Sequence, residues 1–116
     1  MFPEDIQRLA QQIAATASTR GLMLATAESC TGGLVAAALT AVPGTSAALD
    51  RGFVTYSNAA KQQMLGVPEA TLIAHGAVSE PTARAMAQGA VAHSRAAVSV
   101  AVTGIAGPGG GSDDKP

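Results

Sequence analysis

The stretch Ala27-Glu28-Ser29-Cys30-Thr31-Gly32-Gly33 separates a short apolar segment from a segment rich in Ala and Leu. Residues 22–27 are predicted to form a buried strand, and residues 34–42 a helix that stops at Pro43-Gly44. The first N–H groups of such a helix lack intrahelical partners, and the glycines let a ligand approach the backbone closely. The corner can therefore hold an anion or stabilise an oxyanion, with Ser29 or Cys30 as a nucleophile in front of it.

Strand-like and helix-like segments alternate along the rest of the chain. Further strands are predicted over residues 49–56 and 96–102, the second covered on both faces. Further helices are predicted over residues 3–20, 59–65 (with Asn58 as N-cap), 69–75 and from Ser79 to near Arg95. This order predicts a single domain, residues 1–116, with a three-layer α/β/α sandwich around a mostly parallel or mixed sheet. Because the chain stops in a Gly-rich loop, we expect the sheet to lack a closing strand and helix.

Composition excludes several classes of function. The 116 residues carry a formal net charge of −1 with scattered basic residues, and they include no Trp, one Tyr and two Phe, so nucleic acid is not an expected partner. A single cysteine and no recognisable leader favour the cytoplasm, and no apolar stretch approaches the ~20 residues of a membrane span. Glu28, Asp50, His75 and His93 show no metal-ligand spacing, and we expect neither metal nor cofactor.

Three segments follow predicted strands and converge if the strands are parallel. They are the Ser29 corner, the segment from Tyr56 to Lys61, and the loop that begins at Thr103. A lysine in such a crevice loses its proton through desolvation and can then accept the proton of Ser29.

Each of these residues also has a purely structural interpretation. Ser29 is a good helix cap, Lys61 and Tyr56 are common at surfaces, and Cys30 fits as a small buried hydrophobe. A Cys30 nucleophile would need His75 or His93 as its base. The glycines after Thr103 fit a flexible connection as well as a ligand loop, but they open no helix and so are no dinucleotide fingerprint.

Four separated blocks of the sequence resemble the CinA carboxyl-terminal domain family, whose characterised members are nicotinamide-nucleotide amidohydrolases. The blocks are residues 27–33, residues 54–58 with Lys61, residues 76–80, and residues 102–108 with Lys115-Pro116. The resemblance implies hydrolysis of the carboxamide of nicotinamide mononucleotide to nicotinate mononucleotide and ammonia, in pyridine nucleotide recycling. It places the nucleophile on Ser29, the general base on Lys61 and an assisting tyrosine on Tyr56.

The resemblance also implies substrate contacts from two backbone turns, Thr31-Gly32-Gly33 and Thr103-Gly104, and a homodimer. Backbone N–H groups at the start of the helix over residues 34–42 are expected to stabilise the oxyanion. The alternative function is a non-catalytic nucleotide-binding or competence-associated module, in which Ser29 is only a cap.

Overall fold

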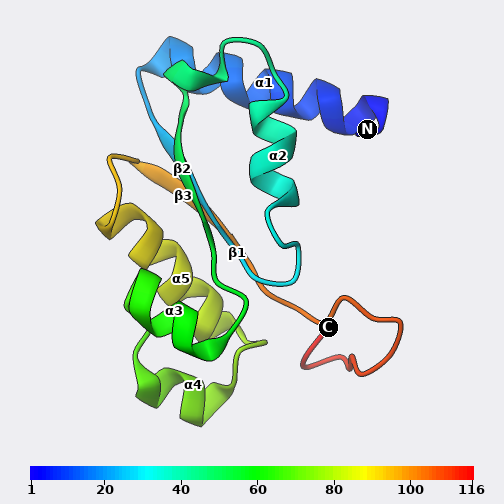
Figure 1. Cartoon of the computed structure of the whole chain (residues 1–116), viewed down its shortest axis with the longest axis vertical. Helices are drawn as coiled ribbons and strands as arrows, with labels where there is room; N and C mark the ends of the chain where they lie inside the picture. Colours follow the sequence, from blue (N-terminus) through cyan, green and yellow to red (C-terminus); the bar gives the residue numbers. More distant parts are fainter.

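Three parallel strands form the centre of the molecule, in a computed structural model that describes residues 1–116 (Figure 1). They are β1 (Leu24–Glu28), β2 (Leu49–Val54) and β3 (Val98–Val102), and their order in the sheet is β2-β1-β3. The register pairs Glu28 with Val54 on one side and with Val102 on the other. The carboxyl ends of all three strands therefore lie at one edge of the sheet.

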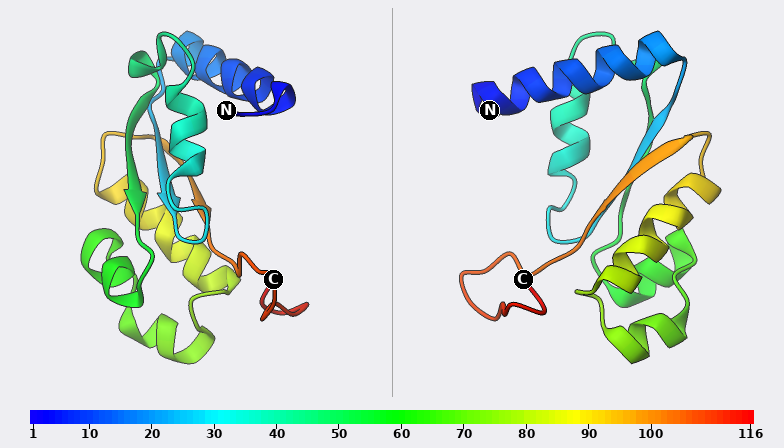
Figure 2. Two further views of the ribbon diagram at one scale, coloured as in Figure 1. Left: turned by 45° about the vertical axis from the view of Figure 1, so that its right-hand side comes forward. Right: turned by 180° about the vertical axis from the view of Figure 1, so that it is seen from behind.

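Helices cover both faces of this sheet (Figure 2). One face carries α1 (Glu4–Arg20) and α2 (Leu34–Thr40), and a short 3-10 helix (Thr45–Ala47) connects α2 to β2. The other carries α3 (Asn58–Leu65), α4 (Glu69–His75) and α5 (Glu80–Ala92). The predicted three-layer α/β/α architecture is confirmed. No helix is both long and apolar enough to cross a membrane.

The bounds of several elements differ from the prediction. β1 runs one residue further, through Glu28, and β2 stops at Val54, so that Thr55 and Tyr56 lie outside the ladder. The N-cap of α3 is Ser57 instead of Asn58, because the Ser57 hydroxyl accepts the N–H of Ala60 at 3.0 Å.

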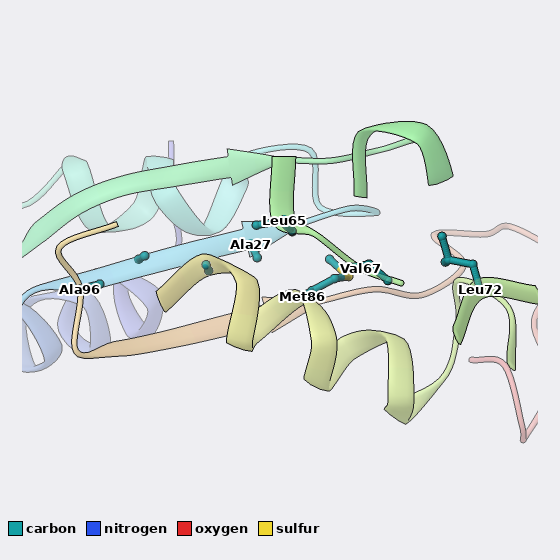
Figure 3. Packing of buried hydrophobic residues seen from close by; sticks show 8 residues of the cluster. Ala27, Leu65, Val67, Leu72, Met86 and Ala96 are labelled. Atoms are coloured by element: carbon teal, nitrogen blue, oxygen red, sulfur yellow. The ribbon is translucent and has the colours of Figure 1, made fainter. Parts of the chain in front are cut away.

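The main core lies between the sheet and the α3–α5 layer (Figure 3). Ala25 and Ala27 of β1 face this layer, where Leu65, Met86 and Ala90 pack against them. Small side chains on the central strand let these helices approach closely, which fixes α3 against the sheet.

The opposite face is only partly covered, which corrects the prediction for β3. Val98 and Val100 are each 46% exposed, because α1 and α2 leave part of the sheet open. An apolar cavity of about 620 Å³ lies there. Only Ala10, Ala14 and Ala17 of α1 are buried, whereas Ile6, Leu9 and Ile13 line this cavity.

The contact between α3 and α5 depends on a glycine. A Cβ atom at Gly89 would lie 2.0 Å from the carbonyl oxygen of Leu65 and 2.8 Å from its carbonyl carbon. The obstacle is backbone, so a larger residue can fit only if one helix moves away from the other.

We expect Gly89→Ala to lower the free energy of unfolding by about 3 kcal/mol, the upper part of the range for overpacked cores. Gly109→Ala is the control, because a Cβ there meets no atom within 4 Å and the substitution should change stability by less than about 0.5 kcal/mol. Urea denaturation followed by circular dichroism measures both. Equal midpoints for Gly89→Ala and the unsubstituted protein would contradict the packing described.

Candidate active site

Ser29 is held at the carboxyl edge of the sheet by both neighbouring strands. Its N–H donates to the carbonyl oxygen of Val102 at 2.9 Å, and the carbonyl oxygen of Glu28 accepts the N–H of Thr55 at 2.8 Å. Side chains alternate between the faces of a strand, so Glu28 points toward α2 and Ser29 toward α3. The corner therefore presents its hydroxyl to the layer that carries Lys61.

Lys61 reaches Ser29 from the buried face of α3. It lies one turn before Leu65, both side chains are buried, and Lys61 is only 1% exposed. Its Nζ is 3.0 Å from the Ser29 Oγ, and it donates to the carbonyl oxygens of Thr55 at 2.9 Å and Tyr56 at 3.0 Å. No carboxylate forms an ion pair with this amine.

Burial favours the uncharged form of this amine. Burial lowers the pKa of Lys61 below its ordinary value, and a smaller electrostatic contribution from Cys30 opposes that change. A neutral amine has two N–H donors and one lone pair. With both donors directed at the two carbonyl oxygens, the lone pair is left to accept the Ser29 proton. The pair thus has the geometry of a nucleophile and its base.

The Tyr56 side chain is not part of this cluster. It is 77% exposed, and its hydroxyl forms no hydrogen bond, whereas its backbone oxygen binds Lys61. The chain leaves β2 after Val54, which turns the carbonyl groups of Thr55 and Tyr56 toward the amine. At this position the backbone carbonyl oxygen, and not the side chain, contacts Lys61.

The N–H groups at the start of α2 are already occupied, which corrects the expectation that they face an oxyanion. Glu28 is fully buried, and its carboxylate accepts the N–H groups of Gly33 at 3.2 Å, Val35 at 2.9 Å and Ala36 at 3.0 Å. It also accepts the Thr31 hydroxyl at 2.5 Å. Burial alone would raise the pKa of Glu28, but the hydrogen bonds from Thr31, Ala36, Val35 and Gly33 outweigh it and lower that pKa.

Two donors of the corner remain free. The N–H groups of Cys30 and Thr31 have no acceptor in the protein, whereas Gly32 donates to the carbonyl oxygen of Ser29 at 3.0 Å. Of the predicted substrate-binding turn, Thr31 therefore keeps a free N–H group, and those of Gly32 and Gly33 are used within the protein.

The loop after β3 lies beside the Ser29 corner, as convergence of the strand ends predicts. A Cβ at Gly104 would lie 3.5 Å from the Cys30 Sγ, so the backbone here approaches the thiol closely. The Thr103 hydroxyl donates to the carbonyl oxygen of Ala77 at 2.9 Å, which ties this loop to the α4–α5 connection. Lys115 donates to the carbonyl oxygen of His75, the last residue of α4, and to that of Val78 in this connection.

The alternative nucleophile has no base in hydrogen-bonding contact. Neither histidine bonds to Cys30, and the Nδ1 of His93, the C-cap of α5, lies 2.8 Å from the Gly89 oxygen. No group of three or more His, Cys, Asp or Glu side chains could hold a metal ion.

Sequence reasoning missed Glu28 as part of the corner. The available signal was the alternation of a strand: if Ser29 faces one layer, the preceding residue faces the other, where the next helix begins. An acidic residue at that point can cap the helix from within the fold.

The fold and the site define a parallel α/β protein with a buried serine–lysine pair at the carboxyl edge of its sheet. The family model described as the CinA C-terminal domain matches residues 6–116. The chain belongs to the CinA C-terminal domain family.

Relatives in this family differ in length. A putative competence-damage inducible protein of Symbiobacterium thermophilum is 57% identical over all 116 residues, which span 27% of that relative. Nicotinamide-nucleotide amidohydrolase PncC of Escherichia coli is 52% identical over the same residues, which span 70% of it. The crystal structure of competence/damage inducible protein CihA from Agrobacterium tumefaciens has a TM-score of 0.95 and 60% identity, and the match covers the whole chain and 70% of that structure.

Proposed function

We propose that the protein hydrolyses the carboxamide of nicotinamide mononucleotide to nicotinate mononucleotide and ammonia. The observation that carries the proposal is the 3.0 Å contact between the buried Lys61 Nζ and the Ser29 Oγ, where no carboxylate forms an ion pair with the amine. The name of the Escherichia coli relative supports the choice of a nicotinamide nucleotide as substrate.

In this proposal Ser29 attacks while Lys61 carries the proton. The neutral Lys61 amine accepts the hydroxyl proton, and the Ser29 Oγ bonds to the carboxamide carbon. The free N–H groups of Cys30 and Thr31 are the donors best placed for the resulting oxyanion, and a single such donor is commonly worth about 3 kcal/mol. Protonated Lys61 then returns its proton to the leaving nitrogen, ammonia departs, and water releases the acyl group from Ser29 by the same route.

Tyr56 and the loop at Thr103 complete the proposal. A proton relay through the Tyr56 hydroxyl requires its exposed side chain to turn inward when substrate binds. Thr103 and Gly104 border the corner, where their backbone can contact the nucleotide. A homodimer remains a prediction from the resemblance, and a cytoplasmic location remains a prediction from the composition.

The experiment is a measurement of ammonia released from nicotinamide mononucleotide by the full chain and by Cys30→Ala. We expect turnover by both, with the variant keeping most of the activity, because alanine preserves the backbone N–H and only the thiol is lost. Loss of the Cys30 contribution also lowers the pKa of Lys61 further, so the pH at which activity rises should move down.

Two results would contradict the proposal in different ways. Thermal stabilisation by the nucleotide without ammonia release would support the non-catalytic binding module. Complete loss of ammonia release in Cys30→Ala, with the fold intact by circular dichroism, would indicate that the thiol performs the chemistry.

A further inference from the structure

Glu28 is a buried carboxylate that binds no cation. Its four hydrogen-bond donors are the Thr31 hydroxyl and the N–H groups of Gly33, Val35 and Ala36. All four come from the turn after Ser29 or from the first residues of α2. One side chain thus connects the end of β1 to both ends of this turn.

The arrangement divides the donors of the corner into two groups. Gly33, Val35 and Ala36 are directed at Glu28, and Gly32 is directed at the Ser29 carbonyl oxygen. Only Cys30 and Thr31 keep their N–H groups free. The hydrogen bond from the Thr31 hydroxyl to Glu28 restrains the orientation of this residue and hence of its backbone N–H group.

Glu28 and Ser29 are also fixed to each other through the strand. The Glu28 carbonyl oxygen accepts from Thr55, whose own carbonyl oxygen binds the Lys61 amine. Movement of Glu28 would therefore disturb the turn on one face and the serine–lysine pair on the other. A preorganised site needs this kind of support, since small displacements of donors reduce transition-state stabilisation.

We propose that Glu28 is a positioning residue, which holds the Thr31–Gly33 turn so that Ser29 and the free N–H groups of Cys30 and Thr31 face one reacting carbonyl group. The use in acyl transfer rests on the proposed function. The carboxylate also fills the start of α2, so the phosphate of a nucleotide substrate binds elsewhere.

Glu28→Gln tests the proposal with little change in volume. The amide nitrogen replaces one carboxylate oxygen and faces N–H or O–H donors, so at least one of the four hydrogen bonds is lost. We expect kcat for nicotinamide mononucleotide to fall about 10²-fold, as when an oxyanion donor is removed, with KM changed by less than about threefold. A lower kcat at a nearly constant KM distinguishes a positioning role from weaker substrate binding.

Asp50→Asn is the matched control. Asp50 is also a carboxylate with a buried side chain, and it pairs with Arg51 and Arg95 at the start of β2, the opposite edge of the sheet. The Asp50→Asn substitution should lower stability without changing kcat per folded molecule. Thermal melting of both variants shows how much protein is folded in each assay.

A second readout does not depend on the nucleotide. Phenylmethanesulfonyl fluoride forms an O–S bond with a reactive serine and releases fluoride, and mass spectrometry measures its rate at Ser29, with Ser29→Ala as the blank. We expect Glu28→Gln to slow this reaction at least tenfold, and Asp50→Asn to leave it unchanged.

The outcomes separate this inference from the proposed function. Slower sulfonylation in Glu28→Gln, in a protein that releases no ammonia, supports positioning and contradicts the amidohydrolase. Unchanged kcat and unchanged sulfonylation in Glu28→Gln overturn the role of Glu28. A Ser29 that neither turns over nucleotide nor reacts with the sulfonyl fluoride overturns both.

Discussion

Ser29→Ala should abolish ammonia release, lowering kcat by about 10⁴-fold or more, because removal of the nucleophile leaves no acyl-transfer route. The protein should still fold. Ser29 is 7% exposed, its side chain is small, and the Lys61 amine keeps its hydrogen bonds to the carbonyl oxygens of Thr55 and Tyr56. A coupled assay for ammonia measures the loss.

Ser46→Ala is the control for this prediction, because Ser46 is exposed in the 3-10 helix between α2 and β2. Its activity should equal that of the unsubstituted protein. If Ser29→Ala keeps a tenth or more of the original kcat, Ser29 is a helix-corner residue and the mechanism above is wrong.

Lys61→Met should separate activity from stability. Methionine fills similar space without an amine, and loss of a general base typically lowers kcat by about 10³-fold. Stability should respond differently to pH. The folded-state pKa of Lys61 is below its ordinary value of 10.5. At pH values between the folded-state pKa and 10.5, the Lys61 amine is protonated in the unfolded chain but not in the folded one, so stability rises with pH.

Lys61→Met lacks this titration, so the rise in stability should disappear and the variant should be at least as stable as the unsubstituted protein at neutral pH. Urea denaturation at a series of pH values measures both proteins. Lys115→Met is the control, since that amine is exposed on the loop after β3. A Lys61→Met variant that unfolds at neutral pH would show that the amine is needed for the fold.

The pairing of Ser29 with Lys61 was accessible from sequence because both residues follow strands. Once residues 22–27 and 49–56 are read as strands and the connections as helices, parallel topology brings Ser29 and the segment after Tyr56 to one edge. The distance between the two side chains depends on how α3 packs, and that packing depends on Gly89 meeting the Leu65 backbone. No local pattern encodes such a contact.

The backbone parts of the site were harder to predict. Sequence assigns a role to the Tyr56 side chain, whereas the structure places its carbonyl oxygen against Lys61, because β2 ends two residues early. The oxyanion donors were expected at the start of α2, where Glu28 already accepts them. In both cases tertiary contacts determine which backbone N–H and C=O groups remain available to the site.

Fold class followed from the alternation of elements, but coverage of the sheet did not. Residues 96–102 are small and apolar apart from Ser99, a pattern typical of a strand buried on both faces. The structure leaves Val98 and Val100 half exposed beside the apolar cavity, since α1 and α2 cover only part of that face. An apolar strand sequence therefore predicts burial but does not show which element covers each face of the strand.

In the proposed mechanism an uncharged Lys61 amine accepts the proton of Ser29. An NMR titration of the ¹⁵N-labelled Lys61 side chain, compared with the pH dependence of kcat/KM for nicotinamide mononucleotide, tests this step. We expect Lys61 to titrate below 10.5 and kcat/KM to rise over the same pH range as the amine loses its proton. A Lys61 amine that titrates at or above 10.5, with full activity where it is still charged, would contradict it.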